Sequence, residues 1–227
     1  MERAAQALGV LGNVLVLMVP AVVLACLLAA APAAAQLAAS PIATPAPDTV
    51  AAPIRQQLST EGHKIALGST TLEFWWVSQL AVAAAGAADW SKVAEGALVG
   101  VIRVSGPFKE IRGKTVNPGV YTLRFGLQPQ NGDHLGVSPF REYLLLSPAA
   151  ADQDPKPLGF DGTVALSKQT IGTSHPAALS LDPPVSTAPP LSAYKSELDH
   201  QGMTFQIKTT PAGSLTFGLI LVGVIEH

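Results

Sequence analysis

The sequence predicts an all-β protein, an antiparallel β-sandwich of jelly-roll or immunoglobulin-like type that follows an N-terminal signal peptide. Two observations predict the sandwich: apolar and polar residues alternate with a period of two in several short runs, and Gly, Pro and Asn separate these runs. A third observation sets the N-terminus apart. Of the first 35 residues 27 are apolar, whereas the whole chain is 48% hydrophobic.

Residues 1–35 have the parts of a secretory signal peptide. A short, weakly charged start precedes the uncharged run 14–31, and small residues lead to a cleavage point after Ala35. Two alternatives stay open, because an apolar run of 18 residues can just span a bilayer and Cys26 could carry a lipid. We expect an exported protein, periplasmic or secreted, that meets the membrane only through this segment if it stays uncleaved.

Removal of the leader leaves a chain of ordinary composition. Glu2 and Arg3 cancel, so the formal net charge stays at -2, and the only cysteine, Cys26, is lost. The exported chain then has no disulfide and no thiolate for metal binding or nucleophilic catalysis. The sequence also has no Lys/Arg cluster and no glycine-rich phosphate loop, so we expect no nucleic-acid partner.

After the leader we expect an Ala/Pro-rich spacer over residues 36–60 and a single β-sandwich domain over residues 61–227. The spacer shows no apolar periodicity. A short helix could form around residues 54–58, although no long amphipathic pattern supports it, and elsewhere a helix is expected only within 81–94. The clearest predicted strands are 72–77, 98–105, 121–127, 141–146, 203–207 and 215–224, and weaker ones are 64–68, 163–168 and 194–198.

One segment carries a family resemblance. Residues 113–124 read GKTVNPGVYTLR, in which Asn117-Pro118-Gly119 sets a tight turn before a strand. This segment resembles a hairpin of many secreted bacterial β-sandwich domains. With QPQNGDHLG and REYLLLSPAA further along, the chain resembles a family of exported bacterial β-sandwich proteins. The resemblance implies fold and export, and no known activity.

The loop Asn131-Gly132-Asp133-His134 is the first candidate site. A carboxylate beside an imidazole could hold a transition metal or act as a general-base pair, and the alternative is an ordinary turn closed by Asp133. Two adjacent residues cannot complete a metal site. The further ligands would come from the remaining histidines: His63, His175, His200 or His227.

Trp75, Arg141 and Glu142 are candidate contacts for a ligand or partner. Trp75 and Trp76 are adjacent, so in a strand they point to opposite faces, and one of them could form an exposed platform. The alternative is that Trp75 packs in the core. Arg141 and Glu142 follow the Asp133–His134 loop closely.

Three weaker patterns complete the search. The acids Asp152, Asp154 and Asp161 could offer oxygens to Ca²⁺, or be solvated loop residues. Ser174-His175 precedes Asp182, but the chain has no G-x-S-x-G turn for a hydrolase nucleophile. A third set looks like the solvent faces of strands: Arg103, Lys109, Arg112, Lys114 and Arg124.

No complete catalytic set emerges from these patterns. We therefore expect an exported, non-catalytic protein without a cofactor, which binds a protein partner or a small ligand at the cell envelope. The alternative is a metal-binding or metal-dependent protein that uses Asp133 and His134.

Overall fold

The computed structural model describes residues 37–84, 89–130, 140–172, 174–182, 189–196 and 198–223, all of which belong to one compact unit. Most elements are strands: β1 (Ala39–Ile42), β2 (Gly62–Leu67), β3 (Thr70–Trp76), β4 (Leu80–Ala81), β5 (Leu98–Val104), β6 (Phe108–Lys109), β7 (Thr115–Val116), β8 (Gly119–Leu127), β9 (Glu142–Pro148), β10 (Ala177–Asp182), β11 (Ala193–Lys195), β12 (Gln201–Thr210) and β13 (Ser214–Val222). The helices are α1 (Ala52–Arg55), α2 (Gly159–Ile171) and the 3₁₀ turn η1 (Trp90–Lys92).

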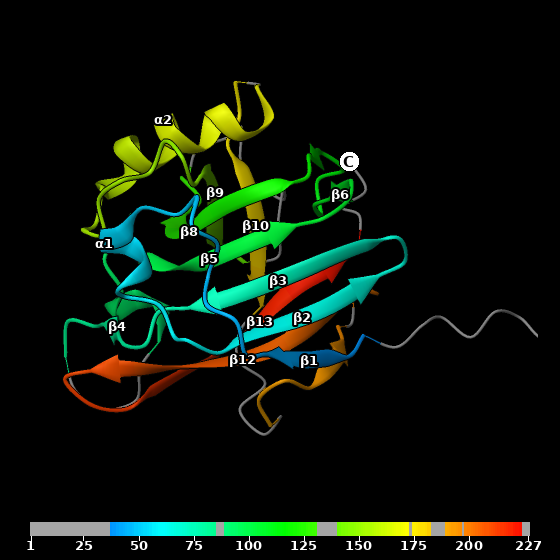
Figure 1. Cartoon of the computed structure of the whole chain (residues 1–227), viewed down its shortest axis with the longest axis horizontal. Coiled ribbons are helices and arrows are strands. Elements are labelled where there is room, and N and C mark those ends of the chain that lie inside the picture. The colour runs from blue at the N-terminus through cyan, green and yellow to red at the C-terminus, as the bar shows by residue number, and fades with distance from the viewer. Residues whose placement is uncertain are drawn as a thin grey trace, which may run out of the picture. The chain divides into compact units, whose positions relative to one another are not determined.

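Eleven of these strands form one curled sheet (Figure 1). Its order is β1-β2-β3-β5-β8-β9-β10-β13-β12-β11, all neighbours are antiparallel, and β4 adds to β12 in parallel. The strands β6 and β7 pair separately. The all-β prediction is therefore confirmed. The finer assignment to a jelly-roll or immunoglobulin-like sandwich stays a prediction.

The concave side of the sheet encloses an aromatic core. Alternation along β3 turns Phe74 and Trp76 inward, and the Trp76 ring centroid lies 4.8 Å from that of Phe205 and 5.3 Å from that of Phe217. Strands that are distant in the sheet order thus pack face to face. The rings of this core are Phe74, Trp76, Trp90, Phe125, Phe205 and Phe217.

The predicted spacer is part of the folded unit. Residues 39–42 form β1 and pair with β2, and the side chains of Val50 and Ile54 are 1% and 0% exposed. The boundary predicted at residue 60 is therefore wrong. The Ala/Pro-rich composition concealed widely spaced apolar residues that pack on the sheet without forming a periodic element: Leu37, Val50, Ile54 and Leu58.

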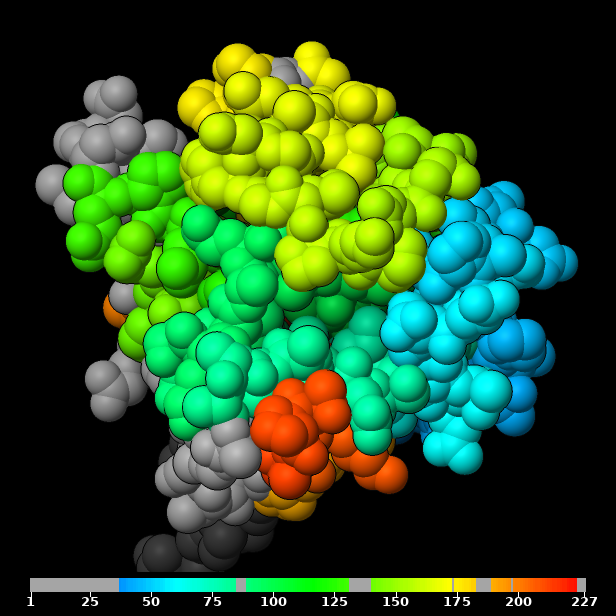
Figure 2. All heavy atoms as spheres, turned by 90° about the vertical axis from the view of Figure 1, so that its left-hand side faces the viewer, coloured from blue at the N-terminus to red at the C-terminus, as the bar shows by residue number. Residues whose placement is uncertain are grey.

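The strand predicted at 163–168 is also wrong, because this segment lies within α2, which covers the outer side of β8, β9 and β10 (Figures 1 and 2). The hydroxyls of Ser167 and Thr170 each donate to the Leu146 carbonyl at 2.7 Å. The buried residues of α2 are thus Ser and Thr rather than apolar residues. For this reason a search for apolar residues at helical spacing does not find this helix. Its end is marked by Gly172, whose φ of 62° is left-handed.

Candidate functional site

The predicted metal loop falls where the structure gives no description. Asp133 and His134 lie within residues 131–139, and His227 lies beyond residue 223, so all three are outside the described residues. Among the residues that are described, no three His, Cys, Asp or Glu side chains come together as a metal site.

Both adjacent tryptophans are buried. Trp75 is 1% exposed, and its indole N–H donates to the Thr44 carbonyl at 2.8 Å. The Arg103 guanidinium lies 5.8 Å from the Trp75 ring centroid. Neither Trp75 nor Trp76, which is 4% exposed, offers an open stacking platform. Trp75 is buried because the segment 37–58 covers it. The composition of this segment had led us to predict a spacer.

Arg141 and Glu142 lie at the start of β9, three places from β3 in the sheet order. The Arg141 Nε–H donates to the Gln128 carbonyl at 3.0 Å, which ties the exposed Arg141 to the end of β8. The structure does not bring Arg141 or Glu142 together with Trp75. The three residues therefore form no common surface.

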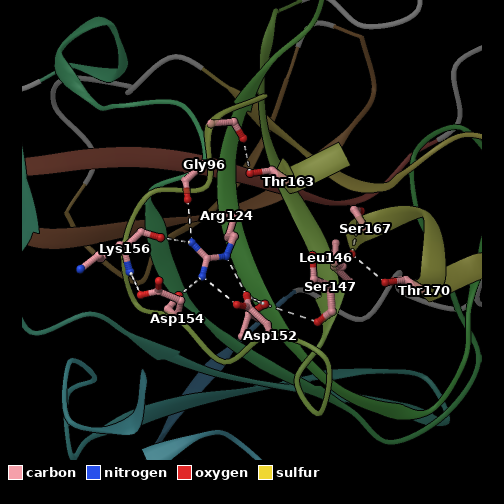
Figure 3. Close-up of polar contacts among 12 residues, drawn as sticks. Gly96, Arg124, Leu146, Ser147, Asp152, Asp154, Lys156, Thr163, Ser167 and Thr170 are labelled. Atoms are coloured by element: carbon pink, nitrogen blue, oxygen red, sulfur yellow. Dashed lines mark hydrogen bonds and ion pairs between the residues drawn. The ribbon is translucent and has the colours of Figure 1, made fainter. Parts of the chain in front are cut away.

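Arg124 forms the most highly connected polar cluster of the described residues (Figure 3). Its side chain is 0% exposed, and its Nε and Nη2 donate to the two Asp152 carboxylate oxygens at 2.7 and 2.8 Å. The remaining N–H groups donate to the carbonyls of Gly96, Asp154 and Lys156. All donors are thus satisfied by the chain itself, which makes this a structural cluster.

The Arg124 cluster corrects two expectations. Arg124 was expected on a solvent face, but the loop before α2 covers it. Asp152 was a candidate for Ca²⁺ binding, but Arg124 neutralises its carboxylate, which also accepts the Thr122 hydroxyl at 2.5 Å. Asp154 instead accepts the Lys156 N–H, and Asp161 lies in the first turn of α2.

The Ser-His-Asp pattern does not assemble. Ser174 and His175 are exposed before β10, whereas Asp182 ends that strand and is 6% exposed. The six residues of β10 separate the two ends by roughly 20 Å.

The outer face of β10–β13–β12–β11 holds a different polar contact. Tyr194 of β11 lies flat across two glycines, so a Cβ at Gly202 would overlap Tyr194 Cζ and one at Gly218 would be 2.6 Å from its hydroxyl. Beyond Gly218 the hydroxyl meets the carboxylate of Asp182, which is opposite Gly218 in the sheet. We call the set Tyr194, Gly202, Gly218 and Asp182 the Tyr194 latch, because it connects edge strand β11 to β10.

Burial dominates the electrostatics of the Tyr194 latch. Desolvation raises the pKa of Asp182, and the contacts with Tyr194 and His200 offset part of this rise. The pKa of Tyr194 is also raised, first by burial and then by the Asp182 carboxylate. The two groups meet off the geometry of a regular hydrogen bond, and His200 Nδ1 is buried without a partner among the described residues. This face is therefore polar but incompletely satisfied.

Both ends of β11 show unusual features. The two non-glycine residues with left-handed backbones in the described chain are Leu191 and Asp199, at φ 61° and 63°. Three of the four exposed large apolar side chains that the structure describes lie on or beside these ends: Leu191 at 40%, Leu198 at 58% and Val222 at 41%.

Sequence reasoning missed the latch because its members lie on four different strands, and no local pattern shows how these strands pair. The only local signals were single glycines within two strands, Gly202 in β12 and Gly218 in β13, because glycine inside a strand often marks close approach of another group.

Comparison with protein-family models, with curated proteins and with solved structures finds no match. Within the described residues no helix is long and apolar enough to cross a membrane.

Proposed function

We propose that this is an exported, non-catalytic protein that binds a protein partner at the cell envelope through the ends of β11. In this proposal residues 1–35 direct export, and the curled sheet acts as a sandwich-like scaffold. The observation that carries the proposal is that exposed Leu191, Leu198 and Val222 all lie at or beside the ends of one short edge strand. Exposed apolar groups at an otherwise polar face are typical of protein–protein contacts.

Charge and geometry fit a protein partner better than a small ligand. Leu191 and Leu198 lie at opposite ends of the β11 segment, and the exposed ion pair Lys195–Asp199 includes the residue next to Leu198. Such a pattern of apolar contacts with a polar rim suits an extended surface rather than a concave pocket.

Site-specific photocrosslinking in the source cells tests the proposal. A photoreactive amino acid at Leu191 or Leu198 should give the same crosslinked species, and Lys168 on the exposed side of α2 should not give it. Leu198→Asp should abolish the crosslink at Leu191. Equal crosslinking from all three positions, or no effect of Leu198→Asp, would contradict a specific partner surface.

A further inference from the structure

We propose that β11 is a displaceable edge strand, and that the partner binds by adding an extended segment of its own to β12 in place of β11. This inference rests on the proposed function and names the kind of partner: a peptide segment in β-conformation.

The first support is the small apolar surface that β11 buries on the inner face of the sheet. Ala193 is the only β11 side chain that packs against the core, where it is partly buried. Burial of one methyl group contributes little to the free energy of folding. By contrast, β12 contributes Met203, Phe205 and Ile207, which are 0%, 0% and 2% exposed. Loss of β11 would therefore leave the core of the sheet nearly intact.

The second support is strain at both ends of the strand. A left-handed backbone is unfavourable for an L-residue such as Leu191, and less so for Asp199. Such residues persist only where surrounding contacts hold them, and they are common in segments that switch. Release of β11 would relieve both conformations at once.

The third support is the backbone pattern. Ser192 and Ser196 direct their backbone bonds to β12: Thr204 N–H donates to the Ser192 carbonyl at 2.9 Å, and Ser196 N–H donates to the His200 carbonyl at 2.8 Å. If β11 leaves, the facing groups of β12 need new partners, and an extended peptide supplies them in the same register.

The Tyr194 latch then opposes the exchange. Its phenol crosses β12 and β13 to reach Asp182, so β11 cannot leave until this contact opens. Removal of the Tyr194 ring should therefore make the β12 edge accessible without altering the inner face of the sheet.

A peptide-binding experiment tests the inference with a defined probe. The probe is a fluorescein-labelled peptide with the sequence of residues 189–196, PPLSAYKS. In a Cys26→Ser background, Tyr194→Ala should bind the probe at least tenfold more tightly than the parent chain. A Tyr194→Ala protein with unchanged far-UV circular dichroism that does not bind the probe would overturn the inference.

A disulfide lock supplies the matched control. Ala193 and Met203 are directly opposite, and the bonding at Ser192 and Ser196 makes them a non-hydrogen-bonded pair with a Cα separation of about 4.5 Å, which a disulfide accepts. Ala193→Cys with Met203→Cys, added to Tyr194→Ala, should bind the probe when reduced and lose at least tenfold in affinity when oxidised. Equal binding in both states would contradict displacement.

The same lock separates the two proposals. If oxidised protein with Tyr194 in place still gives the specific crosslink from Leu198, the partner surface is real but no strand exchange occurs. If the crosslink is absent in every state, the proposed function itself fails.

Discussion

Arg124 fixes the loop before α2 through its hydrogen bonds, although the residues around Arg124 in the sequence give no sign of this contact. Its guanidinium bonds three carbonyls and one carboxylate from two distant segments. We expect Arg124→Ala to lower the free energy of unfolding by about 3–5 kcal/mol, because it leaves the Asp152 carboxylate buried and unpaired. Urea denaturation measures this loss.

Arg103→Ala is the matched control for Arg124→Ala. Arg103 also pairs with a carboxylate, that of Glu73, but its side chain is 47% exposed. The expected loss is below about 1 kcal/mol. Similar losses for the two variants would contradict the structural role of burial at Arg124.

Asp182 gives a pH-dependent prediction. Burial raises its pKa in the folded state, so its stabilising contribution is present below the unfolded pKa and is lost as pH rises through the folded pKa. Asp182→Asn has no ionisable group at this position, so the variant does not lose this contribution as pH rises. The free energy of unfolding of the variant, relative to the parent chain, should therefore increase as pH rises above the ordinary Asp pKa of about 3.9, which urea denaturation at several pH values measures.

Asp199→Asn should show the opposite trend. Hydrogen bonding and charge from Lys195 lower the pKa of Asp199, so its contribution is present above the unfolded pKa and is lost as pH falls. The variant should thus become relatively less stable as pH rises. The same trend for both variants would count against the assignment of Asp182 as a buried, destabilised carboxylate.

At the scale of elements, the junction between η1, β5 and α2 depends on one glycine. Gly96 has φ +78°, and a Cβ there would be 2.5 Å from Gly159 N. Gly96→Ala should cost about 1 kcal/mol for the backbone and about 1–3 kcal/mol more for displaced neighbours. Thermal or urea unfolding checks this loss.

Gly68 supplies the comparison for Gly96, because it has a similar φ of +58° and a Cβ there would have no neighbour within 4 Å. Gly68→Ala should show the backbone cost alone, about 1 kcal/mol. A Gly68→Ala loss as large as that of Gly96→Ala would show that contact with the start of α2 is unimportant.

Strands that show a period of two or a continuous apolar run could be predicted from sequence, as β8 and β13 show, but a helix whose buried face is polar could not. The alternation of Tyr121, Leu123 and Phe125 with polar residues predicted β8, which the structure confirms. The helix α2 was missed because its buried positions are Thr163, Ser167 and Thr170. No local pattern predicts that a helix will dock through hydroxyl-to-carbonyl bonds.

Candidate sites were harder to predict than strands, because a local pattern does not show which distant residues lie close to a given side chain. Trp75 was considered as a platform because a strand pattern fixes its face but not what covers it. The Tyr194 latch requires four strands in the order β10-β13-β12-β11, and strand order is not encoded in any one segment. Pairing partners decide which distant polar groups meet.

For the whole molecule, the segment from residue 37 to residue 58 decides whether the sheet is covered on both sides. A chain that begins at Glu61 loses β1 and the buried side chains of Leu37, Val50, Ile54 and Leu58. Each buried side chain of this size contributes about 1.5–3 kcal/mol, so their sum is comparable with the whole stability of a domain. We expect this chain to be unfolded or aggregated by far-UV circular dichroism and gel filtration.

The control for this truncation is a chain that lacks only residues 1–35. It keeps every contact among the described residues and should remain folded and monodisperse. If the chain beginning at Glu61 had the same spectrum and elution volume, the N-terminal segment would be a dispensable spacer after all.

The burial of the aromatic residues also has an optical consequence. All three tryptophans of the chain are buried: Trp75 at 1%, Trp76 at 4% and Trp90 at 6% exposure. Their emission should therefore be blue-shifted in the native protein and inaccessible to acrylamide, and it should move to the red only when the sheet opens. Trp75 is under the N-terminal segment, whereas Trp76 and Trp90 are in the concave core. Trp75→Phe would therefore leave emission from the concave core alone, and Trp76→Phe with Trp90→Phe would leave emission from Trp75 alone, so that the two variants report the two sides of the sheet separately without any added dye.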